Sequence, residues 1–218
     1  MKQYITLFLL LTFLFLPFNA CLDLKQPSMK IAYYTLDYEH APITGLNQLP
    51  HVLRVGRFSV APLYNSTRII YQDQSFKRDS YIYHRWRIHP GETITHLLTR
   101  DFRLSGLFKA VLSHDNRFLG THLLEGGVDE FFEIDQEKRW EAVLSLSVVL
   151  MREKKEGPQV GSQNGNLIVF QKTYNSVTPC ERKHPRALAE AMSRNMSIVS
   201  TEIISDVYQH LKVDDEKD

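Results

Sequence analysis

The stretch Arg68–Val111 reads RIIYQDQSFKRDSYIYHRWRIHPGETITHLLTRDFRLSGLFKAV and decides the fold class. Its middle part alternates two sets of residues, a period of two that is typical of a strand with two different faces. One face of this strand consists of Tyr81, Tyr83, Arg85 and Arg87. The other face, with Ile82, Trp86 and Ile88, is expected to point inward. A shorter β-branched segment, Arg68–Tyr71, precedes it across a polar turn and predicts a neighbouring strand.

A proline-started helix follows the second strand. Pro90 ends the strand and suits the first turn of a helix, where its missing N–H costs nothing. Apolar residues then recur at spacings of three and four up to Phe102, and Gly106 supplies a C-terminal stop. The stretch therefore predicts strand, turn, strand, helix and the entry to another strand.

The rest of the chain adds more strands and one more helix. Further strands are predicted at 30–38, 52–61, 108–114, 121–134, 140–151 and 166–177. Gly126 and Gly127 suggest a bulge or a bend in their strand. Trp140–Met151 is apolar on one face and partly apolar on the other, which indicates a central strand covered on both sides. Pro185 begins a helix whose apolar residues repeat with a period near 3.6 up to Leu211.

These elements predict a single α+β domain, a twisted antiparallel sheet with two helices packed on one face. We divide the chain into a signal peptide at 1–20, a tether at 21–29, the folded domain at 30–212 and an acidic tail at 213–218. Acidic charge at a helix C-terminus is unfavourable against the helix dipole, so the last helix is expected to end near Leu211.

The N-terminus has the pattern of a secretory leader. One lysine precedes an apolar run from Ile5 to Phe18, which is shorter than the roughly 20 residues of a membrane-spanning helix. Ala20 and Cys21 stand where a bacterial lipoprotein has its small residue and its acylated cysteine. We favour lipidation of Cys21 over two alternatives, ordinary cleavage near Ala20 and an uncleaved anchor. Each buried methylene of an acyl chain contributes about 0.8 kcal/mol, so two or more chains give stable attachment.

Composition and motifs argue against several function classes. The formal net charge is +1, with 23% charged and 11% aromatic residues, as in an ordinary globular protein. This near-neutral charge gives no field that would attract nucleic acid. The sequence has no GxGxxG, P-loop or HExxH pattern. We therefore expect no enzymatic activity, no cofactor and no metal.

Cysteine and histidine positions do not predict a metal site. His84, His89 and His96 lie close together in sequence, but no cysteine joins them at zinc-ligand spacing. Surface or hydrogen-bonded histidines are the better interpretation. If Cys21 is acylated, Cys180 is an isolated thiol; a disulfide between the two cysteines is the alternative in an oxidising compartment.

Several short motifs occur in an order found in a known family. They are Tyr33-Tyr34-Thr35-Leu36, Val55-Gly56-Arg57-Phe58-Ser59-Val60, Arg68-Ile69-Ile70-Tyr71, Tyr81-x-Tyr83-x-x-Trp86-x-x-x-Pro90 and Ser105-Gly106-Leu107-Phe108. With these motifs the chain resembles the ABC-type transport auxiliary lipoprotein family, the PqiC/YmbA-like accessory proteins of Gram-negative bacteria. The resemblance extends from Ile31 to Leu211.

The resemblance implies a non-enzymatic, lipid-anchored periplasmic component of an ABC transport system for lipids. In that family the ATPase and the permease are separate chains, and an MCE-type protein bridges toward the outer membrane. This chain would be the docking piece at that membrane, and self-association into a ring is a further expectation. By resemblance to lipoproteins generally, Leu22 rather than an aspartate after Cys21 favours the outer membrane over the inner one.

One surface is a candidate for partner contact. Tyrosine and arginine are the residue types that anchor interfaces, so the Tyr81, Tyr83, Arg85 and Arg87 face is expected to contact a partner or a sister subunit. The alternative function is a soluble periplasmic binding domain that holds an apolar ligand between sheet and helices. A periplasmic hydrolase is a third and weaker alternative.

Overall fold

A computed structural model describes residues 30–40, 43–74, 76–137, 139–153 and 167–215. The predicted leader, Cys21 and the tether up to residue 29 lie outside the described residues. Residues from Ile31 onward form one compact unit. In the part of the chain that is described, no helix is long and apolar enough to cross a membrane.

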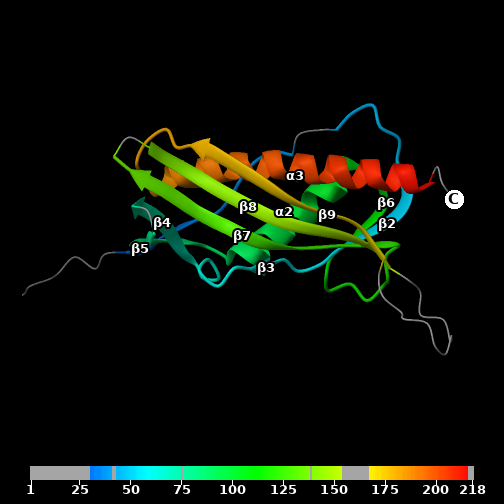
Figure 1. Ribbon diagram of the computed structural model, residues 1–218, viewed down its shortest axis with the longest axis horizontal. Coiled ribbons are helices and arrows are strands. Elements are labelled where there is room, and N and C mark those ends of the chain that lie inside the picture. Colours follow the sequence, from blue (N-terminus) through cyan, green and yellow to red (C-terminus); the bar gives the residue numbers. More distant parts are fainter. Residues whose placement is uncertain (1–29, 41–42, 75, 138, 154–166, 216–218) are drawn as a thin grey trace, which may run out of the picture. The chain divides into compact units, whose positions relative to one another are not determined.

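The longest strand, β7 (His122–Gln136), is the centre of the sheet (Figure 1). Along one edge it pairs antiparallel with β8 (Arg139–Arg152) over almost its whole length. The next strand, β9 (Leu167–Pro179), pairs antiparallel with β8 and has β8 as its only neighbour among the described strands. β7, β8 and β9 therefore form a long antiparallel meander.

The other edge of β7 is shared by three shorter strands that follow one another along it. β2 (Leu49–Val55) pairs with its start, β3 (Ser59–Val60) with its middle and β4 (Arg68–Gln74) with its end. All three run parallel to β7. The α+β class is confirmed, but the sheet is mixed rather than wholly antiparallel as predicted. A helix and several strands separate these partners from β7 in sequence, and such long crossovers permit parallel pairing.

Three further strands complete the sheet. β6 (Phe108–Leu112) lies parallel beside β2. β5 (Lys77–Trp86) is antiparallel to β4, and β1 (Ala32–Tyr34) lies parallel beside β5. The predicted strand at 52–61 is divided into β2 and β3, because the strand pairing is interrupted at Gly56-Arg57-Phe58, although the Gly56 amide still donates to the carbonyl of Leu124 in β7 at 2.8 Å.

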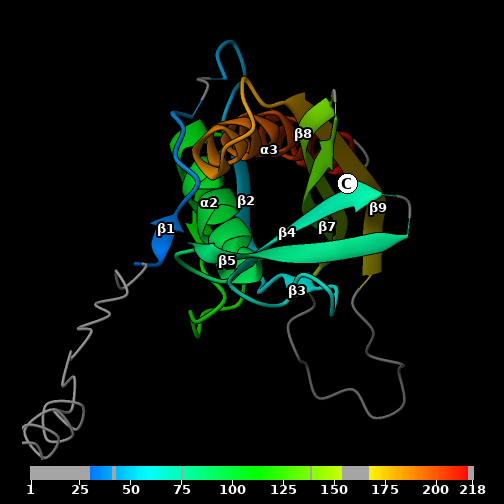
Figure 2. The ribbon, with the colours of Figure 1, turned by 90° about the vertical axis from the view of Figure 1, so that its left-hand side faces the viewer.

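Two helices cover one face of the sheet, which curves around them (Figures 1 and 2). α2 (Pro90–Ser105) has the predicted proline at its start and ends at Gly106, whose φ of 66° is a left-handed conformation that glycine adopts easily. α3 (Pro185–Asp215) runs four residues beyond the predicted end at Leu211. Lys212 lies in its last turn, where a cation interacts favourably with the helix dipole and offsets the acidic residues beyond.

The core forms between the sheet and the helices. Alternate residues of β8 are completely buried: Ala142, Leu144, Leu146, Val148 and Leu150. The facing residues of α3 are also completely buried: Leu188, Met192, Met196, Val199, Ile203 and Val207. Each buried leucine or isoleucine contributes about 1.5–3 kcal/mol relative to an exposed one. These side chains fill the space in which the alternative function would place an apolar ligand.

The opposite face of β8, predicted to be covered as well, is covered only in part. Val143 and Ser145 are buried, whereas Ser147 and Val149 are half-buried. In the neighbouring strand, the ring of Phe132 stacks on Tyr64 from the connection between β3 and β4, with centroids 6.0 Å apart. A small second cluster therefore lies on this side of the sheet.

Buried polar groups join the helices to the rest of the domain. Asn195 on α3 donates a hydrogen bond to the carbonyl of Ala142 at 2.8 Å and accepts from the hydroxyls of Ser176 and Thr178 at 2.9 and 2.5 Å. Asn195-Met196-Ser197 matches the glycosylation sequon, but Asn195 is completely buried, so its amide is not accessible for glycosylation.

A second buried group links both helices to an N-terminal segment. Asp101 on α2 is completely buried and accepts hydrogen bonds from Tyr38 at 2.6 Å and from Ser200 of α3 at 2.7 Å. Its other oxygen accepts from Arg100, whose guanidinium lies 4.5 Å from the centre of the Tyr38 ring. Burial and the hydrogen bond to Asp101 raise the pKa of Tyr38 far above its usual range.

Candidate functional site

The predicted partner face lies on β5, next to the edge strand β1. Tyr83 is 38% exposed, Arg87 is exposed and Arg85 is half-buried. Tyr81, the fourth predicted member, turns inward instead and is half-buried. The structure thus brings three of the four residues to one surface and separates Tyr81 from them.

A bulge in β5 explains the position of Tyr81. Arg85 pairs with Arg68 of β4, whereas Ser80 pairs with Ile70, so five steps of β5 lie opposite two steps of β4. Extra residues break the in-and-out alternation of side chains at that point. Ile82, which was expected to point inward, is consequently 71% exposed. Ile88 lies beyond the end of β5 at Trp86 and is 46% exposed, so only Trp86 of that set is buried.

The edge strand enlarges the same surface. β1 pairs with β5 so that Tyr33 lies beside Arg85, and Tyr33 is 51% exposed. The guanidinium of Arg87 lies 5.2 Å from the centre of the Tyr33 ring, a cation–π contact of about 0.5–1 kcal/mol at an exposed site. We call Ile31, Tyr33, Tyr83, Arg85 and Arg87 the edge surface.

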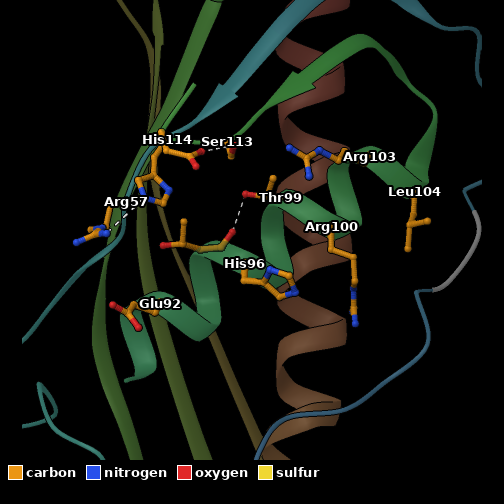
Figure 3. A pocket seen from close by; sticks show the side chains of 11 residues that line it. Arg57, Glu92, His96, Thr99, Arg100, Arg103, Leu104, Ser113 and His114 are labelled. Carbon is orange, nitrogen blue, oxygen red and sulfur yellow. Dashed lines mark hydrogen bonds between the residues drawn. The ribbon is translucent and has the colours of Figure 1, made fainter. Parts of the chain in front are cut away.

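A cavity of about 580 Å³ lies elsewhere, along the outer side of α2 (Figure 3). Its lining comes from three separate segments of the chain. The residues are Arg57 after β2, then Glu92, Thr95, His96, Thr99, Arg100, Arg103 and Leu104 of α2, and finally Ser113, His114 and Asp115 after β6. This volume lies within the range of pockets that hold small molecules.

Many polar groups in this cavity already have partners within the protein. The Thr95 hydroxyl donates to the carbonyl of Gly91 and accepts from the amide of Phe58, and Thr99 donates to the carbonyl of Thr95 (Figure 3). Asp115 accepts from the Ser113 hydroxyl at 2.5 Å, and this hydrogen bond lowers the pKa of its carboxyl.

A buried acidic cluster lies near the inward-facing Tyr81. The Tyr81 hydroxyl donates to Oε2 of Glu133, which is completely buried, at 2.7 Å. Burial raises the pKa of Glu133 to about 7, with a further increase from nearby Asp135. Lys183 forms an ion pair with Asp135 at 2.7 Å. Burial also raises the pKa of the neighbouring Cys180 thiol to about 12, so this thiol stays protonated.

The three clustered histidines do not come together. His84 is half-buried, accepts or donates a hydrogen bond at 3.1 Å with the Tyr34 hydroxyl, and packs against the Tyr81 and His184 rings. Burial lowers its pKa, and His184 lowers it further. His89, just before α2, and His96, on α2, are both exposed. Over the described residues, no group of three histidine, cysteine or acidic side chains could hold a metal ion.

Sequence reasoning missed the cavity and the acidic cluster. The cavity joins Arg57, α2 and His114, which no spacing rule brings together. In the sequence, Glu133 follows two phenylalanines at strand spacing, which favours a solvated edge or turn, but in the structure it pairs with Ala142 of β8 on the face covered by the helices. The available signal was that Glu133 shares its side of the strand with apolar Phe131, which indicates a buried carboxylate.

Comparisons with known proteins show a shared fold. No family model and no curated protein sequence matches the chain. Among solved structures, a protein from Xanthomonas campestris of the family DUF330 is similar with a TM-score of 0.73 at 19% identity, over 85% of this chain and 99% of that one. An uncharacterized protein is similar with a TM-score of 0.58 at 12% identity, over 82% of this chain and 99% of that one.

Proposed function

We propose that the chain is a lipid-anchored periplasmic accessory component of an MCE-type ABC transport system. In this proposal, acyl chains on Cys21 hold it at the inner leaflet of the outer membrane, and its folded domain docks the periplasmic part of the transporter there. It acts by position and not by catalysis. The transported cargo would be lipid, by resemblance to the PqiC/YmbA-like proteins.

The edge surface is the observation that carries this proposal. It combines exposed aromatic and aliphatic side chains with arginines, a composition enriched in protein interfaces. It also begins at Ile31, two residues after the end of the predicted tether at residue 29. The nine residues 22–30 span at most about 30 Å when fully extended, so a lipidated Cys21 would keep the edge surface close to the membrane. A partner bound there is held at high effective concentration near that membrane.

The fold likeness supports the same family. The similar protein from Xanthomonas campestris belongs to DUF330, the family of the PqiC/YmbA-like proteins. Two features support this proposal. One is the set of sequence motifs with the lipoprotein-like leader, and the other is an α+β domain with the architecture of the Xanthomonas campestris protein. Homo-oligomer formation through the edge surface is part of the proposal, because β1 is an edge strand with β5 as its only neighbour among the described strands.

Fatty-acid labelling tests the anchor. Cells that express the native chain or the Cys21→Ser variant are fed a clickable palmitate analogue, and the membranes are then separated by density. We expect label on the native chain only, and the native chain in the outer-membrane fraction. A native chain that takes up no label and remains in the soluble periplasm would refute the anchored role.

Affinity capture tests the docking role. A purified MCE-type protein of the same organism is incubated with the native chain, with Tyr33→Ala, with Arg87→Glu and with the matched control Arg117→Glu. Arg117 is exposed and lies outside the edge surface. We expect capture by the native chain and the control and at least tenfold less by the two edge variants. Size-exclusion chromatography of the same variants separates loss of self-association from loss of partner binding. Equal capture by all four proteins would show that the edge surface is not the docking site.

A further inference from the structure

The cavity along α2 has an unusual distribution of charge. Its two carboxylates are compensated by the protein itself. Glu92 lies in the first turn of α2, where the helix dipole favours negative charge. Asp115 accepts a hydrogen bond from the Ser113 hydroxyl, and this hydrogen bond lowers the pKa of its carboxyl. Neither acid therefore requires a cationic ligand.

Two of the three guanidinium groups are only partly compensated: Arg103 lies near enough to Asp115 to help lower the pKa of that carboxyl, but it forms no ion pair with it. Arg100 forms an ion pair at 2.8 Å with the completely buried Asp101, so its charge already has a partner within the protein. Arg57 is exposed, and its side-chain contact within the described chain is His114 Nε2 at 3.4 Å (Figure 3). Arg103 donates its Nε to the carbonyl of Val111 at 3.1 Å, which leaves its terminal nitrogens for other acceptors. Neither has a carboxylate within ion-pair distance among the described residues.

The floor between these arginines offers little to a purely polar ligand. The hydroxyls of Thr95 and Thr99 are engaged by backbone groups and each residue is only 5% exposed, so these side chains offer the cavity no free hydroxyl donor. Leu104 adds apolar surface at the far end of the cavity and is 61% exposed. An exposed leucine beside a preformed cavity gains favourable contacts when an apolar group covers it.

We propose that this cavity binds an anionic amphiphile, a molecule with a carboxylate or phosphate head group and an aliphatic chain. Arg57 and Arg103 hold the head group through charge-assisted hydrogen bonds, which guanidinium forms well with both anions. The chain extends toward Leu104. The inference concerns a ligand site and does not depend on where the protein is anchored or which protein it docks.

Calorimetric titration of the full chain carrying Cys21→Ser tests the proposal, since that substitution keeps a protein-bound acyl chain out of the cavity. Four probes are used below their micelle concentrations: octyl phosphate, decanoate, inorganic phosphate and octyltrimethylammonium. We expect octyl phosphate or decanoate to bind at least tenfold more tightly than inorganic phosphate and octyltrimethylammonium. Tighter binding of octyl phosphate indicates a phospholipid-type ligand, and tighter binding of decanoate indicates a fatty acid; either result supports the proposal.

Arginine variants locate the binding site. Arg57→Gln and Arg103→Gln are each expected to weaken binding of the preferred anionic probe roughly tenfold, the usual scale for a lost charge-assisted hydrogen bond. Arg117→Gln removes an exposed arginine from the same connection as His114 but outside the cavity, and it should change the affinity less than twofold. Circular dichroism and melting temperature confirm that each variant is folded.

Four results would overturn the proposal. They are no measurable binding of either anionic amphiphile, equal binding of the cationic amphiphile, equal binding of inorganic phosphate, and affinities unchanged by both cavity substitutions. The labelling and capture experiments on the anchored role have different readouts, so failure of one proposal is distinguishable from failure of the other.

Discussion

The hydroxyl of Tyr81 lies 2.7 Å from Oε2 of Glu133, so one residue of the predicted partner face donates a hydrogen bond to a completely buried carboxylate. The other oxygen of Glu133, Oε1, accepts no hydrogen bond from the described residues. A buried carboxylate with half of its acceptors unused is costly when ionised. This pair therefore makes the stability of the domain depend on pH.

The first prediction concerns Glu133→Gln. Burial raises the pKa of Glu133 from about 4.5 to about 7 in the folded protein. Between these values the folded protein holds a proton that the unfolded chain has released, so the free energy of unfolding falls as pH rises from about 4.5 to about 7. We expect the glutamine variant to be more stable than the parent at pH 8, by about 1–3 kcal/mol, and similar to it at pH 5.

Urea unfolding of both proteins between pH 5 and pH 8 provides the measurement. Glu130→Gln is the matched control, because Glu130 is exposed on the same strand. The control should leave the pH profile unchanged. If parent and Glu133→Gln profiles run parallel from pH 5 to pH 8, Glu133 is not protonated in the folded protein and the prediction is wrong.

The second prediction concerns Asn195→Ala. The substitution removes three hydrogen bonds and leaves the Ala142 carbonyl and the Ser176 hydroxyl without their partner in a buried place. We expect a loss of about 2–4 kcal/mol in the free energy of unfolding, measured by urea denaturation. Asn175→Ala, at an exposed position of β9, should cost less than about 0.5 kcal/mol. Equal losses for the two variants would show that the Asn195 network contributes nothing specific.

Local patterns predicted the elements of this fold well. The even-numbered residues of β8 alternate strictly from Ala142 to Leu150, and all of them are buried. Pro90 and Gly106 likewise bound α2 as expected. These features depend on residues a few positions apart, so the sequence contains the whole signal.

Long-range features could not be predicted in the same way. The strands that share one edge of β7 are separated from it by many residues, and strand direction depends on connections whose path the local pattern does not record. The inward turn of Tyr81 depends on extra residues in β5, which appear only in the pairing with β4. The cavity likewise needs Arg57 and His114 to meet across two different connections.

The third prediction concerns the reactivity of Cys180. Because burial raises the pKa of its thiol to about 12, the reactive thiolate is scarce near neutral pH. In the Cys21→Ser background, we expect the folded protein to react with Ellman's reagent at pH 8 at least about 100-fold more slowly than a free cysteine. Unfolding in urea should restore the ordinary rate. A fast reaction in the folded protein would show that the thiol is accessible and ionised.

The last prediction separates two explanations for the adjacent glycines of β7. The sequence suggested a bulge or bend at Gly126 and Gly127, but the irregularity in the pairing with β8 lies further on, between Val128 and Glu130. A Cβ atom on Gly126 would lie 2.2 Å from the Ser147 carbonyl oxygen and 2.6 Å from a ring carbon of Phe58. This glycine is therefore required by close packing of the Phe58 ring and of the neighbouring strand.

Alanine substitution at each glycine tests this explanation. Gly126→Ala must displace strand backbone or the buried Phe58 ring, and we expect it to cost about 2–4 kcal/mol in urea unfolding. At Gly127 the nearest atoms to a Cβ are the hydroxyl oxygens of Ser59 and Ser147, at 3.1 and 3.2 Å, and these side chains can rotate. Gly127→Ala should therefore cost less than about 1 kcal/mol. Equal costs at both positions would mean that the pair supplies a flexible bend, and that the approach of Phe58 does not select glycine at residue 126.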